Sequence, residues 1–139
     1  MMEQIDLDTL MYPDPRDVGQ CKTPTEMIKE YAKVSGQKPS VGLYTQLIFE
    51  EFREWEEENV PVAELKELAD LLYVIYGYAN ARGWDVEEAL KRVHENNMGR
   101  MYQPDGTIKR RADGKIIKNP DYPKVTLEDL VRCSSFSPS

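Results

Sequence analysis

Apolar residues recur every three to four positions over much of the chain, which is the spacing of amphipathic helices. Four stretches show this period between capping signals: 23–36, 40–59, 61–83 and 85–101. Thr23-Pro24-Thr25-Glu26 combines an N-cap, a proline at the first helical position and a capping-box glutamate. Ser40 can cap the second stretch, Gly83 is a left-handed stop for the third, and Asp85 with Glu88 forms a second capping box. The sequence therefore predicts an all-α fold of the four-helix-bundle type.

The pattern changes after Met101. Two turn signals, Asp105-Gly106 and Asp113-Gly114, flank short runs that predict a small hairpin arm. The run from Thr126 to Asp129 resembles a capping box for one last helical turn. The organisation we expect is an irregular leader over 1–22, a helical core over 23–102, a hairpin arm with a short helix over 103–133, and a disordered end over 134–139.

Acidic residues interrupt the apolar rows of two predicted helices. In 40–59 the inner row continues onto Glu51 and Glu54. In 61–83, Glu67 and Asp70 fall in line with the apolar positions. Because the link between these helices is short, they are antiparallel neighbours, and the two acid pairs face each other. We therefore expect four carboxylates to converge.

Converging carboxylates at a partly buried site are costly, since burial and mutual repulsion both oppose ionisation. A divalent cation removes that cost, and oxygen ligands without nearby Cys or His suit Mg²⁺ or Mn²⁺. Acids three residues apart share a helix face, so each pair can chelate from one side. The residues alone leave a second interpretation open, in which the acids are a solvated surface and the chain is a non-catalytic helical interaction module.

The bulk composition excludes several classes of partner. A net charge of −7 argues against nucleic acid, whose phosphates need a clustered basic surface. No apolar stretch approaches the roughly 20 residues of a membrane span, and the acidic first ten residues do not suit a secretory signal. Cys21 and Cys133 have no metal-binding spacing, so we expect free thiols and a cytoplasmic protein.

Positive charge collects near the C-terminal end. Between Arg100 and Lys124, seven Lys or Arg residues face three acids. An acidic helical half and a basic tail can together hold a metal-complexed polyphosphate, with carboxylates on the metal and cations on the phosphates.

The acidic positions resemble a known signature. Glu50-Glu51-Phe52-Arg53-Glu54, followed after twelve residues by Glu67-Leu68-Ala69-Asp70, is similar to the E-E-x-x-E and E-x-x-D motifs of the MazG-like all-α nucleoside triphosphate pyrophosphohydrolases. The tail over 105–122 resembles the phosphoribosyl-ATP pyrophosphohydrolase-like branch, so the likeness covers about residues 24–125. In that branch the position of Arg100 is more usually lysine.

The resemblance implies cleavage between the α- and β-phosphates, giving a nucleoside monophosphate and pyrophosphate. The metal ligands that it implies for Mg²⁺, or alternatively Mn²⁺, are Glu51, Glu54, Glu67 and Asp70. The catalytic residues that the resemblance implies are Glu50, Glu51 and Glu54, although an outward salt bridge is an alternative role for Glu50. The substrate contacts that we expect are Asn97, Arg100, Arg111, Lys115 and Lys118 at phosphate or sugar and Trp55 at the base, with Tyr44, Tyr73 and Trp84 as further aromatic candidates.

Two substrates stay open. We favour a free (deoxy)nucleoside triphosphate, with a purine such as dGTP or dATP on resemblance alone, because no cyclohydrolase domain is attached and similar relatives act on nucleotide pools. Phosphoribosyl-ATP is the alternative. The aromatic residues of 61–83 exceed what one thin bundle can bury, so we expect a homo-oligomer, either a dimer or a dimer of dimers. The basic tail would then reach a neighbour's site.

Overall fold

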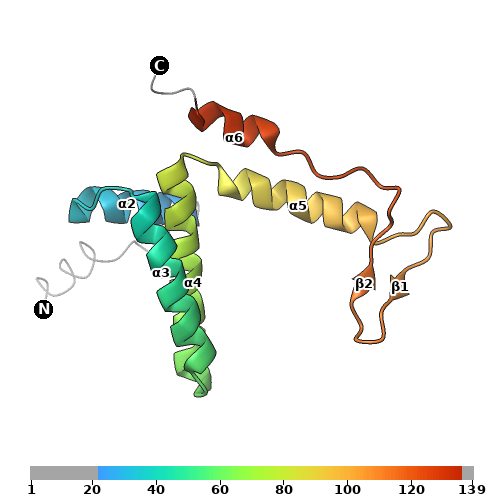
Figure 1. Cartoon of the computed structure of the whole chain (residues 1–139), viewed down its shortest axis with the longest axis horizontal. Coiled ribbons are helices and arrows are strands. Elements are labelled where there is room, and N and C mark those ends of the chain that lie inside the picture. The colour runs from blue at the N-terminus through green and yellow to red at the C-terminus, as the bar shows by residue number, and fades with distance from the viewer. Residues whose placement is uncertain (1–21, 136–139) are drawn as a thin grey trace, which may run out of the picture.

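The computed structural model describes residues 22–135 and is helical apart from one small hairpin (Figure 1). Its elements in chain order are α2 (Pro24–Ser35), α3 (Val41–Glu57), α4 (Pro61–Arg82), α5 (Val86–Arg100), β1 (Lys109–Arg110), β2 (Ile116–Ile117) and α6 (Glu128–Ser135). The predicted all-α class is confirmed. The leader predicted over 1–22 lies outside the described residues except for Lys22, as do residues 136–139 of the predicted end.

Local capping chemistry sets the helix ends. The Thr23 hydroxyl accepts from the Glu26 amide, and the Glu26 carboxylate accepts from the Thr23 amide, which completes the predicted capping box. Gly83 ends α4 in the left-handed conformation, at a φ of 76°. Asp85 caps α5 by accepting from the Glu88 amide. The second half of that predicted box is absent, because the Glu88 carboxylate binds Arg92 instead.

The packed part of the chain consists of α2, α3 and α4. Figure 1 shows α3 and α4 side by side as an antiparallel pair, with α2 crossing beside them. Ile28 of α2, Tyr44 of α3 and Val74 of α4 are buried between these helices. The Tyr44 ring lies directly over Gly77, where any Cβ atom would overlap it. Close helix contact therefore depends on the absence of a side chain at that position.

Helix α5 leads away from the α3–α4 pair (Figure 1). None of its residues is buried. Four helices are present as predicted, but a single chain does not close them around one core. Within residues 22–135, α2, α3 and α4 do not cover α5, and no apolar residue of α5 is buried.

The hairpin arm and α6 are attached to α5. Strands β1 and β2 pair antiparallel, as predicted, with Lys109 opposite Ile117. The Asn119 amide donates to the Arg100 carbonyl at 2.7 Å, and the Tyr122 ring covers Gly99. The guanidinium of Arg92 holds both carboxylate oxygens of Asp129, at 2.7 and 3.0 Å, so that α6 lies along α5.

Helix α6 runs to Ser135 and so exceeds the single turn that the sequence predicts. Within residues 22–135, no helix combines the length and apolar character that a membrane crossing requires.

Candidate metal centre

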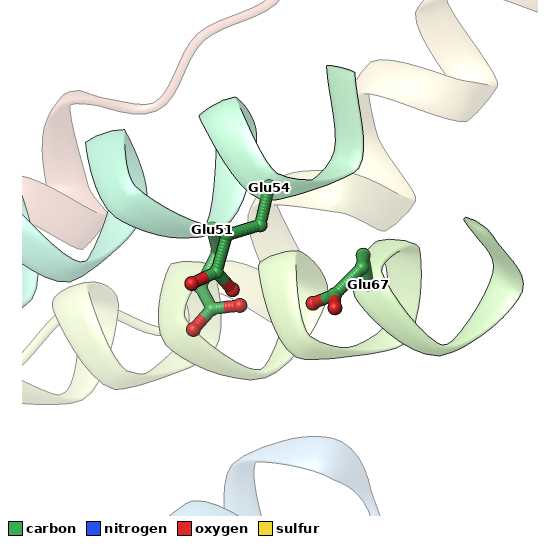
Figure 2. Close-up of side chains that lie close together, drawn as sticks. All are labelled: Glu51, Glu54 and Glu67. Carbon is green, nitrogen blue, oxygen red and sulfur yellow. The ribbon is translucent and has the colours of Figure 1, made fainter. Parts of the chain in front are cut away.

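Three carboxylates meet between α3 and α4. Figure 2 shows Glu51 and Glu54 of α3 extending toward Glu67 of α4. One oxygen from each lies within 4.8 Å of the others, close enough to bind one ion together. The arrangement follows from the sequence, since Glu51 and Glu54 share a helix face and the short α3–α4 link brings Glu67 opposite them.

The chemistry of this cluster fits a divalent cation. Glu51 Oε2 and Glu67 Oε1 are buried and accept no hydrogen bond from a described residue. Burial raises the pKa of Glu51, and the neighbouring charges of Glu54 and Asp70 raise it further. Burial also raises the pKa of Glu67, against the opposing effect of Lys66. Hard oxygen ligands whose ionisation is opposed in this way are stabilised by an ion such as Mg²⁺.

Asp70 lies beside the three glutamates and makes a different contact. Its Oδ2 is 2.7 Å from Nζ of Lys66, one turn earlier on α4. The same Nζ lies 4.0 Å from Oε1 of Glu67. Our sequence interpretation missed Lys66, although its i,i+4 spacing to Asp70 was readable in the sequence.

A cavity of about 400 Å³ opens beside the acids, between α2, α3 and α4. Glu51 and Asp70 form part of its wall. Its other lining residues are Tyr31, Gln37, Tyr44, Leu47, Tyr73 and Val74. The rings of Tyr31 and Tyr73 meet edge to face at 5.9 Å. Gln37 Nε2 donates to the Tyr44 hydroxyl at 3.1 Å, which places one polar side chain from the α2–α3 loop in a largely aromatic wall.

The predicted aromatic contacts divide between two places. Tyr44 and Tyr73 line the cavity. Trp55 does not, and its ring packs near Phe52 at 5.7 Å on α3. Trp84 lies at the far end of α4, beside Tyr78 and the Arg82 guanidinium. Only the first pair is placed to contact a ligand that also reaches Glu51.

The remaining predicted site residues lie apart from the acid cluster. Glu50 is exposed on α3. Asn97 is exposed on α5, and Arg100 is half-buried at its end, with Nη1 donating to Asn96 at 3.5 Å. Lys115 and Lys118 are exposed on the hairpin arm, where Arg111 pairs with Asp113. Because α5 and the arm lead away from α3 and α4 in Figure 1, one chain does not bring these cations to the acids.

Residues 20–97 match the sequence profile of the phosphoribosyl-ATP pyrophosphohydrolase family. This is more than half of the chain and includes all four acids of the α3–α4 pair. The chain belongs to this family. No curated protein matches the sequence.

Membership of the phosphoribosyl-ATP pyrophosphohydrolase family confirms the resemblance to the MazG-like all-α superfamily. It also shows that the protein is an enzyme that hydrolyses a nucleotide pyrophosphate bond. The family typically depends on a divalent metal, and the cluster of Glu51, Glu54 and Glu67 has the donor atoms for one. The matched region ends at Asn97, so Arg100 and the hairpin arm lie beyond it.

Proposed function

We propose that the protein cleaves a nucleoside triphosphate between its α- and β-phosphates, releasing a monophosphate and pyrophosphate. The observation that carries the proposal is the meeting of Glu51, Glu54 and Glu67, with two buried oxygens that accept no hydrogen bond from any described residue. These three residues, with Asp70, would hold Mg²⁺, or Mn²⁺ in its place. When bound, the ion supplies positive charge that offsets the charge developing on the phosphate oxygens.

The protein's own groups would position the reactants. Glu50 lies outside the three-carboxylate cluster and is exposed on the same helix. Because it adjoins Glu51 in the chain and leads the acidic motif, it is our candidate for orienting the attacking water, while Glu51 and Glu54 would hold the ion and the phosphates in register. The water oxygen would bond to the α-phosphorus as the bond from that phosphorus to the bridging oxygen breaks, pyrophosphate would leave, and one of these carboxylates would accept the proton of the water.

The neighbouring cavity suits the nucleoside half of the substrate. Its volume of about 400 Å³ falls in the range of small-molecule pockets. Tyr73 and Tyr44 offer aromatic surface, and Gln37 offers an amide for the edge of a base. Since Glu51 and Asp70 belong to the same wall, a base in the cavity leaves its phosphates at the acids.

The substrate we favour is a purine deoxynucleotide, dGTP or dATP. The second candidate is phosphoribosyl-ATP, and the family match favours it by name. Both carry a purine that the cavity could receive. They differ in the phosphoribosyl group on the purine ring and in the 2′-hydroxyl of the sugar, which only phosphoribosyl-ATP has.

The deciding experiment is a panel of ribo- and deoxynucleoside triphosphates together with phosphoribosyl-ATP, each with and without Mg²⁺. Monophosphate and pyrophosphate are measured separately, and Glu51→Gln is the matched inactive control. We expect metal-dependent pyrophosphate release from dGTP or dATP and none by the variant. Turnover of phosphoribosyl-ATP alone would establish the second candidate. Release of orthophosphate, or no turnover of any substrate, would refute the proposed reaction.

We also propose that the enzyme is a homo-oligomer built on a dimer. A row of exposed apolar side chains follows α4 at alternating spacings of three and four: Leu65, Leu68, Leu72 and Ile75. Leu65 is 67% exposed and Leu72 is 54% exposed. Helical geometry places this row on the side of α4 opposite Asp70 and Val74. Phe49 and Phe52 of α3 are also exposed, and we propose that they extend the same apolar face. Two such faces, brought together, form a four-helix bundle of coiled-coil type.

The same assembly would complete the substrate site. Arg100 ends α5, and Lys115 and Lys118 belong to the hairpin arm; both elements lead away from α3 and α4 in Figure 1. If they contact phosphate, as we propose, they must do so on another copy. The surplus of positive charge on the arm and the acids of the α3–α4 pair give the electrostatic reason for this exchange.

A further inference from the structure

The inference concerns Lys66, which is the one cation that ion-pairs with an acid of the metal centre among residues 22–135. Its Nζ contacts Asp70 at 2.7 Å and lies 4.0 Å from Glu67. Asp70 is the proposed ligand whose oxygens fall outside the three-carboxylate cluster. The carboxylate that has not joined the cluster is thus the one held by an ammonium group.

Lys66 is free to change partners. Its side chain is 69% exposed, so Nζ can leave Asp70 without disturbing any packing. Exposed ion pairs of this kind are weak, and lysine is a compact charge on a flexible stem. A divalent ion that recruits Asp70 competes with the ammonium for the same oxygen atoms.

We propose that Lys66 is an exchangeable counter-ion, which pairs with Asp70 in the metal-free enzyme and with substrate phosphate once the ion has taken Asp70. The inference rests on the proposed function. Its physical basis is that the displaced ammonium stays within a side-chain length of the acids, where the nearest unpaired anion is then the polyphosphate. Lys66 would thereby bring a cation to the phosphates from the same chain as the acids. The cations of α5 and the arm do not reach the acids of their own chain.

The proposal predicts effects of opposite sign in one variant. Lys66→Met keeps the aliphatic stem and a good helix former but removes the charge. Metal binding should tighten, because the ion no longer displaces an ammonium group. Nucleotide binding should weaken by about tenfold, the loss of one charge-assisted hydrogen bond to phosphate.

The test is titration calorimetry in two stages on full-length protein. Mg²⁺ alone is titrated first, and a non-hydrolysable α,β-methylene deoxynucleoside triphosphate is then titrated at saturating Mg²⁺. Lys33→Met is the matched control, since Lys33 is exposed on α2 and has no ion pair with a described residue. Lys66→Arg should restore nucleotide affinity, because it restores the charge.

The outcomes separate the inference from the proposed function. Tighter Mg²⁺ binding with weaker nucleotide binding in Lys66→Met, and neither in Lys33→Met, supports the exchange. Unchanged affinities, or a loss of both together, would overturn it while leaving the metal site intact. If the wild-type enzyme binds no Mg²⁺, the exchange and the proposed function both fail.

Discussion

Glu51 couples the stability of the fold to pH. Its pKa is raised, first by burial and then by the charges of Glu54 and Asp70, so the folded state holds the proton to a higher pH than the unfolded chain does. Stability contributed by this group is therefore present below the ordinary carboxyl value of 4.5 and is lost as pH rises through the raised pKa. Ionisation of Glu51 in the metal-free enzyme therefore lowers the stability of the fold as pH rises.

Glu51→Gln should thus be more stable than the wild type near neutral pH without metal, because the variant removes a buried, mutually repelled charge. The advantage should shrink as pH falls toward about 4.5, where the wild-type carboxyl also holds its proton. Added Mg²⁺ should raise the melting temperature of the wild type much more than that of the variant. Scanning calorimetry with and without Mg²⁺ at both pH values measures all three effects.

Glu56→Gln is the control, since Glu56 is exposed on the same helix and outside the cluster. A variant at Glu51 that is less stable than the wild type in the absence of metal would contradict the interpretation of the cluster as an ion site.

At the scale of single residues the sequence revealed the acids but not their neighbours. Glu51, Glu54 and Glu67 could be predicted because each breaks an apolar row at helical spacing. The Gln37–Tyr44 contact could not, since it depends on how the irregular loop after α2 folds back onto the start of α3. Lys66 was missed for another reason. Oppositely charged residues four positions apart are common on exposed helices, and most such pairs have no function.

The pairing of α3 with α4 depends on one glycine. Gly77→Ala should destabilise the fold by about 1–3 kcal/mol, because the new methyl group overlaps the Tyr44 ring and forces that ring out of its packed position. It should also raise KM, since Tyr44 forms part of the cavity wall. Urea denaturation and steady-state kinetics measure the two effects.

Gly42→Ala provides the matched comparison on α3. A Cβ atom there meets only Ser40 Oγ, at 3.9 Å, so the change should be neutral or stabilising by up to about 1 kcal/mol. Equal stability of the two alanine variants would show that the Tyr44–Gly77 contact does not limit helix approach.

Most element boundaries could be predicted because they are local. Thr23, Ser40 and Gly83 act within one turn of their own helices, and the structure confirms all three. Asp85 illustrates the limit, since its expected partner Glu88 instead pairs with Arg92 of α5, which also binds Asp129 of α6. The direction in which α5 leaves α4 was likewise unreadable, because no apolar residue of α5 is buried against the rest of the chain.

The assembly of the whole molecule can be tested on the apolar row of α4. Leu68→Glu with Leu72→Glu places four like charges in each proposed dimer interface, so the double variant should sediment as a monomer. Val34→Glu is the control, because Val34 is 80% exposed on α2, away from that row. Equal sedimentation of the double variant and the wild type would exclude this face as the interface.

Sharing of sites between copies can be tested by complementation. One inactive variant is Glu51→Gln, and the other combines Arg100→Ala, Lys115→Ala and Lys118→Ala. If the cations act on a neighbour's site, hybrids of the two contain one intact site, and equal co-expression should restore about a quarter of wild-type activity. If they act within their own chain, every site in the hybrid is defective, and the mixture should stay as inactive as its components.

At the scale of the whole molecule, the sequence was enough to predict the fold class but not to predict how the helices pack around a core. The acid signature and four capped helices indicated an all-α enzyme of this superfamily, which the family match confirms. The apolar faces of these helices can pack against each other within one chain or against a second copy. A hydrophobic row such as Leu65 to Ile75 has the same spacing in both cases, so the sequence does not distinguish them.

The exposed row on α4 also bears on how the enzyme withstands heat. With the row covered by a second copy, folding and association become a single equilibrium, and mass action enters the free energy of unfolding. The melting temperature should then climb with protein concentration. Enzyme diluted for a kinetic assay should therefore unfold at a lower temperature than the same enzyme in a concentrated stock.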